Sequence, residues 1–330
     1  MKYKSIVVTA RGGPEVLQIV ENDLHPPLTG QARVKVLATP VCQDDIAVRR
    51  GNRPWLAKIP FTPGYTILGV VDAIGAGIDD LAVGDRVVAL INFGGHSEYI
   101  YWDAAGLVQV PENLDPAEAV SLILNYLVAY QVLHRVAQVQ SGDKALIVGA
   151  SGGCGTALLQ LGALAGLQIY GLASPGKHHI LTEYGAAPLD YHTGDFVEII
   201  RQTEPAGLDF VFNGMGEEYL PGGMAVLRRG GAIVHYGAPQ SFSRFILFMV
   251  RFFLYNLLPN GKKIKGYGTH RLGVDLFAED WQTLFKLLAE GKIKPIIAAK
   301  FPILEAVKAN QLLESGRVIG NIVLLAPELL

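Results

Sequence analysis

The stretch IVGASGGCGTALLQLG, residues 147–162, is an apolar run that breaks into glycines and then resumes as helix-forming sequence. Within it Ala150, Gly152 and Gly155 form the pattern A-x-G-x-x-G, a variant of the dinucleotide-binding fingerprint with Ala in the first position. Gly152 would let the backbone approach a pyrophosphate, and Gly155 would let the helix pack closely on the strand. The N–H groups at the helix start favour a negative charge. The predicted pyrophosphate turn comprises Ala150, Ser151, Gly152, Gly153, Cys154 and Gly155.

The sequence around this turn alternates strand and helix patterns. Candidate strands are KALIVG, LQIYGLA, APLDY, LDFVFNG, GAIVHYG and KIKGYG, separated mostly by helical stretches such as TALLQLGALA. Alternation of this kind implies βαβ units, and about six strands is the count of a doubly wound parallel sheet. We therefore predict an α/β Rossmann coenzyme domain over residues 123–271. A turn that merely packs is the structural alternative to a nucleotide site.

The first 122 residues have a different rhythm. Short β-rich runs such as SIVVTA, ARVKVLATPV and DRVVALI alternate with turn signals, which predicts a β-rich, barrel-like or sandwich-like domain. The final NIVLL, residues 321–325, has the pattern of a strand that returns to this domain. We expect residues 1–122 and 272–330 to form one discontinuous domain.

Composition excludes several classes of protein. Half of the 330 residues are apolar and 18% are charged, which is typical of a globular chain, and the net charge of −2 gives no reason to expect nucleic acid as a partner. Two cysteines are too few for a disulfide framework or a four-cysteine zinc lobe. The N-terminal MKYKSIVVTARGG lacks a signal-peptide pattern, so we expect a cytoplasmic location.

The end of the second strand of the βαβ series predicts which coenzyme is bound. An NAD site usually has Asp or Glu there, about 20 residues after the turn. Here IYGLASPGKHH, residues 169–179, contains no carboxylate and offers the Ser174 hydroxyl and the Lys177 ammonium. A 2′-phosphate is held by a cation and a hydroxyl, so the sequence favours NADPH over NADH. The alternative is that Lys177 is a solvated residue in the first turn of the next helix.

Three stretches resemble a known superfamily almost from end to end. IPFTPGYTILGVVDAIGAGIDDLAVGDRVVAL, NYLVAYQVL and SGDKALIVGASGGCGTALLQL resemble the medium-chain dehydrogenases/reductases, in particular the zinc-free quinone oxidoreductases and related enone reductases. The resemblance implies a GroES-like catalytic domain beside the Rossmann domain, an active site in the cleft between them, and a homodimer.

The zinc-ligand positions of this superfamily are mostly occupied by other residues. Its zinc enzymes have Cys in a C-x-x-D motif and a His-Glu pair after Pro-Gly. Cys42 stands in CQDD, but Pro63-Gly64 is followed by Tyr65 and Thr66. Catalytic zinc takes about three protein ligands, so we expect no metal.

Reduction without a Lewis acid favours a conjugated substrate. Hydride addition to a quinone or an α,β-unsaturated carbonyl delocalises the charge, so the protein must orient, exclude water and hydrogen-bond the oxygen. We expect a small apolar carbonyl or quinone substrate. The alternatives are a 2-enoyl thioester reductase and a low-turnover NADPH-binding protein that acts at membranes.

The resemblance also implies roles for individual residues. Cys42 would contact the nicotinamide or the substrate, or would be a buried apolar thiol, and Tyr65 would donate its phenolic hydrogen to the substrate oxygen or would pack. Asn125 and Val128 match a segment that lines the nicotinamide, and Tyr191 matches a Tyr near the adenosine phosphate. The carboxyl ends of the fourth and fifth strands add Asn213, Tyr236 and Gly237 to the predicted coenzyme site.

Residues 242–258 are longer and more aromatic than a simple connection between strands. Arg244 and Arg251 are seven apart and share one face of the predicted helix, while Phe, Leu and Met cover the rest. A substrate lid, a subunit interface and contact with a membrane surface are the alternatives. Liposome flotation of the protein and of a Phe248→Glu, Phe252→Glu variant would separate them.

Overall fold

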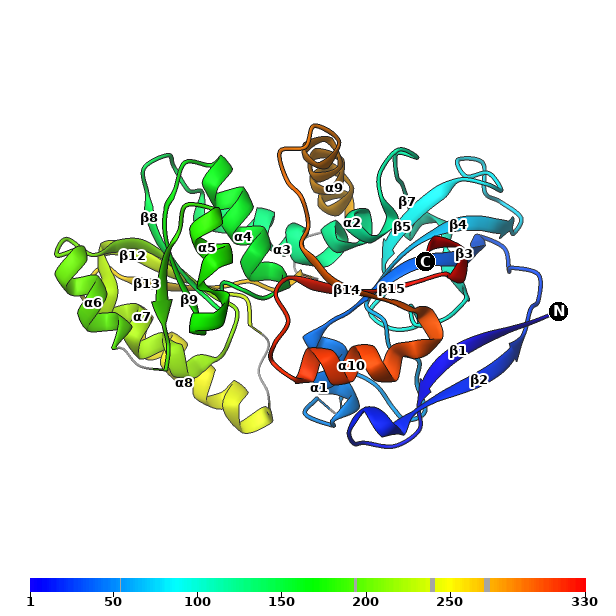
Figure 1. The fold of residues 1–330 in the computed structure, drawn as a ribbon, viewed down its shortest axis with the longest axis horizontal. Coiled ribbons are helices and arrows are strands. Elements are labelled where there is room, and N and C mark those ends of the chain that lie inside the picture. The colour runs from blue at the N-terminus through cyan, green and yellow to red at the C-terminus, as the bar shows by residue number, and fades with distance from the viewer. Residues whose placement is uncertain (54, 193–194, 238–240, 270–273) are drawn as a thin grey trace. The chain divides into compact units, whose positions relative to one another are not determined.

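The computed structural model of the protein describes residues 1–53, 55–192, 195–237, 241–269 and 274–330. Its contacts divide the chain into unit 1, Met1–Leu124 with Trp281–Leu330, and unit 2, Asn125–Asp280 (Figure 1). Both divisions fall inside helical runs, the second within α9 (Val274–Ala289). The first lies two residues from the boundary at 122/123 that the sequence indicates, and the second lies nine residues from the boundary at 271/272. No glycine or proline interrupts residues 117–137 to mark the first junction.

Unit 2 contains a six-stranded sheet in the order β10-β9-β8-β11-β12-β13, with every neighbouring pair parallel. All six carboxyl ends therefore lie at the same edge, and the chain reverses its direction of winding between β8 and β11, which is where such sheets bind ligands. The prediction of a doubly wound parallel sheet is confirmed. Its strands are β8 (Lys144–Val148), β9 (Gln168–Ala173), β10 (Ala187–Asp190), β11 (Leu208–Asn213), β12 (Leu227–His235) and β13 (Lys263–Gly266).

Buried apolar side chains explain why these segments form a covered sheet. Leu146, Val148 and Val211 are buried, as parallel strands covered on both faces require, and they pack with Leu220 and Ile233 in one core cluster. The helices of this unit are α3 (Leu127–Tyr130), α4 (Gly153–Leu164), α5 (His178–Glu183), α6 (Phe196–Thr203), α7 (Leu220–Val226) and α8 (Phe242–Leu257).

Unit 1 is β-rich, as the sequence predicts for a GroES-like domain. Its seven-stranded sheet runs β14-β15-β3-β4-β5-β7 with β6 paired to β3, and β1 and β2 form a separate antiparallel pair. Strand β15 (Asn321–Leu325) pairs antiparallel with β3 (Gln31–Val41), so the C-terminal segment completes the sheet. The remaining strands are β1 (Lys2–Val8), β2 (Leu17–Asp23), β4 (Thr66–Ile74), β5 (Arg86–Leu90), β6 (Tyr99–Asp103), β7 (Val108–Gln109) and β14 (Ile297–Pro302); the helices are α1 (Gln43–Arg49), α2 (Pro116–Ser121) and α10 (Ala306–Glu314).

One helical run in the described part of the chain, Pro116–Ala137, is long and apolar enough to cross a bilayer by length and composition. Its most apolar window is 78% buried within the structure, which is the environment of a core helix. The run includes π-helical turns at Leu122–Tyr126 and Gln131–Ala137.

Candidate coenzyme and active site

The glycine-rich turn joins β8 to α4. Gly149 follows β8 directly with a φ of +82°, a left-handed conformation that favours glycine, and Gly152 is the N-cap of α4. At Gly155 a Cβ atom would collide with the Gly149 carbonyl oxygen and come within 2.5 Å of the Ala150 carbonyl carbon, so helix and strand meet backbone to backbone. At Gly152 the nearest atom to a Cβ would be 3.7 Å away, which leaves this position open to a ligand.

Sequence reasoning missed Gly149 as part of this turn. It took Ala150 as the first position of the pattern, whereas Gly149 makes the sharp bend at the strand end. The signal was present, because a glycine directly after a continuous apolar strand is typical of a tight strand-to-helix turn. Ala150 and Ser151 are buried, and the Ala150 N–H donates to the Leu172 carbonyl oxygen at 3.1 Å.

A second contact ties the turn to the preceding helical run. Cys154 Sγ donates to Asn125 Oδ1 at 3.1 Å, so these two predicted site residues touch. Val128, one turn further on, is buried at 6% exposure and belongs to the packed side of the run. The thiol at position 154 thus orients the amide of Asn125 beside the N-terminus of α4.

Ser174 and Lys177 lie at the carboxyl end of β9, next to the glycine turn in the sheet order. Ser174 is the N-cap of the short 3-10 helix Pro175–Lys177, and its carbonyl oxygen accepts from the Lys177 N–H at 2.9 Å. Lys177 is partly buried, and this loss of solvent lowers the pKa of its ammonium group. His178 turns back to the Ala173 carbonyl oxygen, 3.1 Å from its Nε2.

The predicted residues at the other strand ends differ in their surroundings. Tyr191 follows β10, is 46% exposed and lies against the His192 ring at 4.0 Å. Tyr236 follows β12, and its ring covers Gly214 so closely that no side chain would fit there; burial raises the pKa of its phenol. Gly237 has the Met215 and Gly214 carbonyl oxygens within 2.8 Å of where a Cβ would lie.

Asn213 has an internal role that the sequence did not reveal. Its Nδ2 donates to the Gly216 carbonyl oxygen at 2.9 Å, and its Oδ1 accepts from the Met215 N–H at 3.0 Å. The side chain is 1% exposed. The amide therefore shapes the loop after β11, and only indirectly the crevice beside it.

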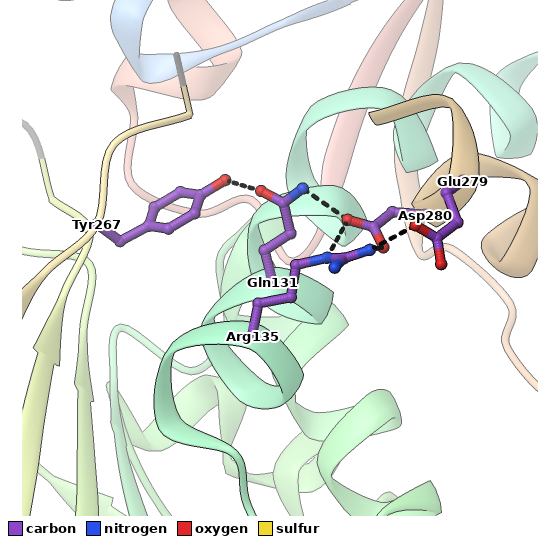
Figure 2. A network of polar contacts seen from close by, with 5 residues as sticks. All are labelled: Gln131, Arg135, Tyr267, Glu279 and Asp280. Carbon is purple, nitrogen blue, oxygen red and sulfur yellow. Dashed lines mark hydrogen bonds and ion pairs between the residues drawn. The ribbon is translucent and has the colours of Figure 1, made fainter. Parts of the chain in front are cut away.

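A polar network centred on the buried Gln131 and Asp280 lies beyond Asn125 on the same helical run (Figure 2). Gln131 donates to Asp280 Oδ2 at 2.6 Å and accepts from the Tyr267 hydroxyl at 2.7 Å. Arg135 binds both carboxylate oxygens of Asp280, and its NH2 group also reaches Glu279. The network joins Tyr267, directly after β13, and Glu279 and Asp280 of α9 to the run that carries Asn125. Sequence reasoning missed it because its members are far apart in the chain.

Cys42 in unit 1 is held by Asp45. The Cys42 N–H and Sγ both donate to Asp45 Oδ2, at 3.0 and 3.1 Å, and the Gly64 N–H donates to Asp45 Oδ1 at 2.9 Å. Burial, followed by the charges of Asp45 and Asp44, raises the pKa of the Cys42 thiol well above its ordinary value. The sulfur is therefore a protonated donor at the start of α1.

Tyr65 follows the Gly64 that Asp45 holds. Burial, followed by the charge of Asp44, raises the pKa of its phenol, so the hydroxyl keeps its hydrogen. Its carbonyl oxygen accepts from the Ile91 and Asn92 N–H groups at 2.9 and 3.1 Å. Asn92 has a φ of +66°, and within the described residues its buried Oδ1 has no hydrogen-bond partner. Asn92 is thus a further polar group beside Tyr65, which its sequence context did not single out.

The residues at the family's metal positions form no metal site in the described part of the chain. No group of three or more His, Cys, Asp and Glu side chains there has an arrangement that could hold a metal ion. His96, which lies beside the Asp45 that holds Cys42, has its Nε2 4.0 Å from Asp45 Oδ2 and 3.2 Å from the Pro40 carbonyl oxygen.

Comparison with known proteins agrees with this architecture. Residues 29–112 match the alcohol dehydrogenase GroES-like domain family, and residues 184–324 match the zinc-binding dehydrogenase family. The chain is 30% identical to the rat synaptic vesicle membrane protein VAT-1 homolog, over 97% of this chain and 83% of that protein. It is 26% identical to rat quinone oxidoreductase, over 98% and 97% of the two chains.

Two solved structures extend the comparison. A mycobacterial protein complexed with NADPH has a TM-score of 0.84 and 26% identity, covering 98% of this chain and 99% of that one. The JamJ enoyl reductase has a TM-score of 0.87 and 25% identity, covering 99% and 100%. From these matches over nearly its whole length, the chain belongs to the medium-chain dehydrogenase/reductase superfamily of oxidoreductases, in the quinone oxidoreductase-like branch.

Proposed function

We propose that this protein is a zinc-independent, NADPH-dependent reductase of quinones or α,β-unsaturated carbonyl compounds. The observation that carries the proposal is the end of β9, where Ser174 and Lys177 stand at the position at which an NAD enzyme has a carboxylate. The family, the quinone oxidoreductase relative and the NADPH-bound neighbour support the same class of reaction.

The glycine turn fits a dinucleotide. Gly152 leaves open space at the N-terminus of α4, where N–H groups and the helix dipole favour a pyrophosphate. The neighbouring carboxyl end of β9 then lies on the side of the adenosine ribose, with Tyr191 one strand further along. When bound, the coenzyme supplies a hydride to the substrate.

A 2′-phosphate suits Lys177 for an electrostatic reason. Partial burial disfavours the charged ammonium form of Lys177. An adjacent phosphate with nearly two negative charges would stabilise this form and offset the loss of solvation. Ser174 adds a hydroxyl donor next to it. A carboxylate at the same point would instead repel the phosphate.

The donor set around Cys42 does not fit catalytic zinc. The Cys42 thiol is engaged with Asp45, and Tyr65 and Thr66 supply neither imidazole nor carboxylate at the second ligand motif. We therefore derive no step through a metal. Tyr65 instead offers a phenolic hydroxyl that keeps its hydrogen and would donate a hydrogen bond to a carbonyl oxygen as negative charge develops there.

The experiment for the proposed reaction is NADPH oxidation, followed at 340 nm, with a panel of quinones, enones and enoyl thioesters. Turnover of quinones or enones supports the proposal. Tight NADPH binding without oxidation of any substrate contradicts it. That result supports the alternative of a low-turnover coenzyme-binding protein that acts at membranes, in keeping with the name of the synaptic vesicle membrane protein VAT-1 homologs.

A 2-enoyl thioester reductase is the second candidate, because the JamJ enoyl reductase has the same fold over the whole chain. Faster turnover of crotonyl thioesters than of free enones in the same panel distinguishes it. The homodimer and the cytoplasmic location remain predictions, and light scattering of the purified protein tests the first.

A further inference from the structure

Helix α8 belongs to unit 2 (Figure 1). Its apolar side chains include an exposed set. We call its outward side chains the outer face. They are 41–79% exposed, and no residue of the 16-residue helix is buried. Their spacing of three and four residues puts them on one side of the helix. The outer face consists of Phe245, Ile246, Val250, Phe253, Leu254 and Leu257.

The opposite side of α8 is anchored, so the orientation of the outer face is fixed. The Phe248 ring stacks on His235 with 4.6 Å between centroids, and Phe248 and Phe252 pack on the core of unit 2. Arg251 donates to the Glu217 carbonyl oxygen at 2.7 Å, while Arg244 pairs with the carboxylates of Glu217 and Glu218.

The C-terminal end of α8 lies in a basic region. Residues 241–269 contain five Lys and Arg and no Asp or Glu. Lys263 and Arg229 are exposed, and Arg229 lies against Gly261. Arg201 is close enough to Lys262 to lower the pKa of that lysine further, after the larger effect of burial. We call Arg201, Arg229, Lys262 and Lys263 the basic end.

We propose that the outer face and the basic end form a docking surface for an anionic lipid bilayer. This inference is independent of the proposed reaction. A helix of 16 residues, about 24 Å long, would lie in the plane of the interface with its apolar side chains below the head groups. Residues 241–269 of a second copy would bring no carboxylate to the basic end, whereas anionic head groups complement it.

Co-sedimentation with phosphatidylcholine vesicles, with and without phosphatidylserine, tests the proposal. We expect at least about tenfold stronger binding to the phosphatidylserine vesicles. Phe253→Gln with Leu257→Gln should lower that binding at least about tenfold. Arg229→Gln with Lys263→Gln should remove the preference for phosphatidylserine. Leu164→Gln with Ile199→Gln, which changes two exposed apolar residues on α4 and α6, is the matched control and should bind like the wild type.

Circular dichroism and coenzyme titration establish that each variant is folded. Absence of vesicle binding by the wild type overturns the proposal. Equal loss in the α4 and α6 control overturns it as well, since binding would then not depend on α8. Light scattering adds a third test: an oligomer that dissociates in the Phe253→Gln, Leu257→Gln variant would assign the outer face to self-association. Loss of turnover with a water-soluble quinone in that variant would assign it to the substrate site.

Discussion

Gly155 lies directly against the carbonyl group of Gly149, the residue that follows β8 and begins the coenzyme turn. No atom of a side chain fits between them. Gly152, three residues earlier, has the opposite environment, because the space beside it is open. The two glycines of the same motif therefore have separable roles: one permits the fold and the other permits the ligand.

Gly155→Ala should destabilise the protein, whereas Gly152→Ala should not. Overpacking against the Gly149 and Ala150 backbone costs about 2 kcal/mol of unfolding free energy or more. At Gly152 the φ of −78° suits alanine, so stability should change by less than about 0.5 kcal/mol, while the methyl group fills the open space and raises the Kd for NADPH at least about tenfold. Urea denaturation and coenzyme titration of both variants measure this. Unchanged NADPH affinity in Gly152→Ala would show that the pyrophosphate does not bind at this turn.

His235 should make stability depend on pH. Burial lowers its pKa from 6.5 to about 4, so the folded state holds it neutral while the unfolded chain takes up a proton. Stability is therefore lost as the pH falls from about 6.5 toward about 4, by up to about 3 kcal/mol. His235→Phe should remove this part of the pH dependence. Urea denaturation of both proteins at about pH 7 and about pH 4.5 gives the difference, and parallel curves would contradict the assignment.

The Arg135–Asp280 pair should matter more than the exposed ion pairs. The Asp280 side chain is 1% exposed. Arg135→Ala would leave its buried carboxylate to the Gln131 amide without a compensating positive charge, which costs about 3 kcal/mol of unfolding free energy. Lys292→Ala, which breaks the exposed pair with Glu290, should cost less than about 1 kcal/mol. Equal losses of unfolding free energy in the two variants, measured by urea denaturation, would mean that the network in Figure 2 stabilises the fold no more than an exposed ion pair does.

Tyr65→Phe should lower kcat and leave the Kd for NADPH unchanged. The raised pKa keeps the phenol protonated, so wild-type kcat should not fall through ionisation of Tyr65 below about pH 10. Loss of a hydrogen bond to a developing charge corresponds to a decrease of at least about tenfold. Steady-state rates at saturating NADPH measure the change in kcat. An unchanged kcat would mean that Tyr65 has only a packing role.

The sequence was sufficient for those features that depend on local patterns. The six strands of unit 2 and the strand–turn–helix around Gly152 follow from apolar runs and glycine positions that lie within a few residues of one another. The parallel order then follows from the βαβ alternation.

Features that depend on distant residues were not predictable in the same way. The apolar pattern of residues 242–258 made Phe248 and Phe252 candidates for membrane contact, but both side chains pack inward, against His235 and the core of unit 2. Nothing within residues 242–258 contains that information. The internal hydrogen bonds of Asn213 likewise depend on the conformation of the loop that follows β11.

The most direct test of the central claim is calorimetric titration of the wild type and of Lys177→Ala with NADPH and with NADH. The account predicts that the wild type binds NADPH at least about tenfold more tightly than NADH, and that Lys177→Ala loses most of this preference while its affinity for NADH is retained. A wild type that prefers NADH, or a variant that keeps the full preference for NADPH, would contradict it.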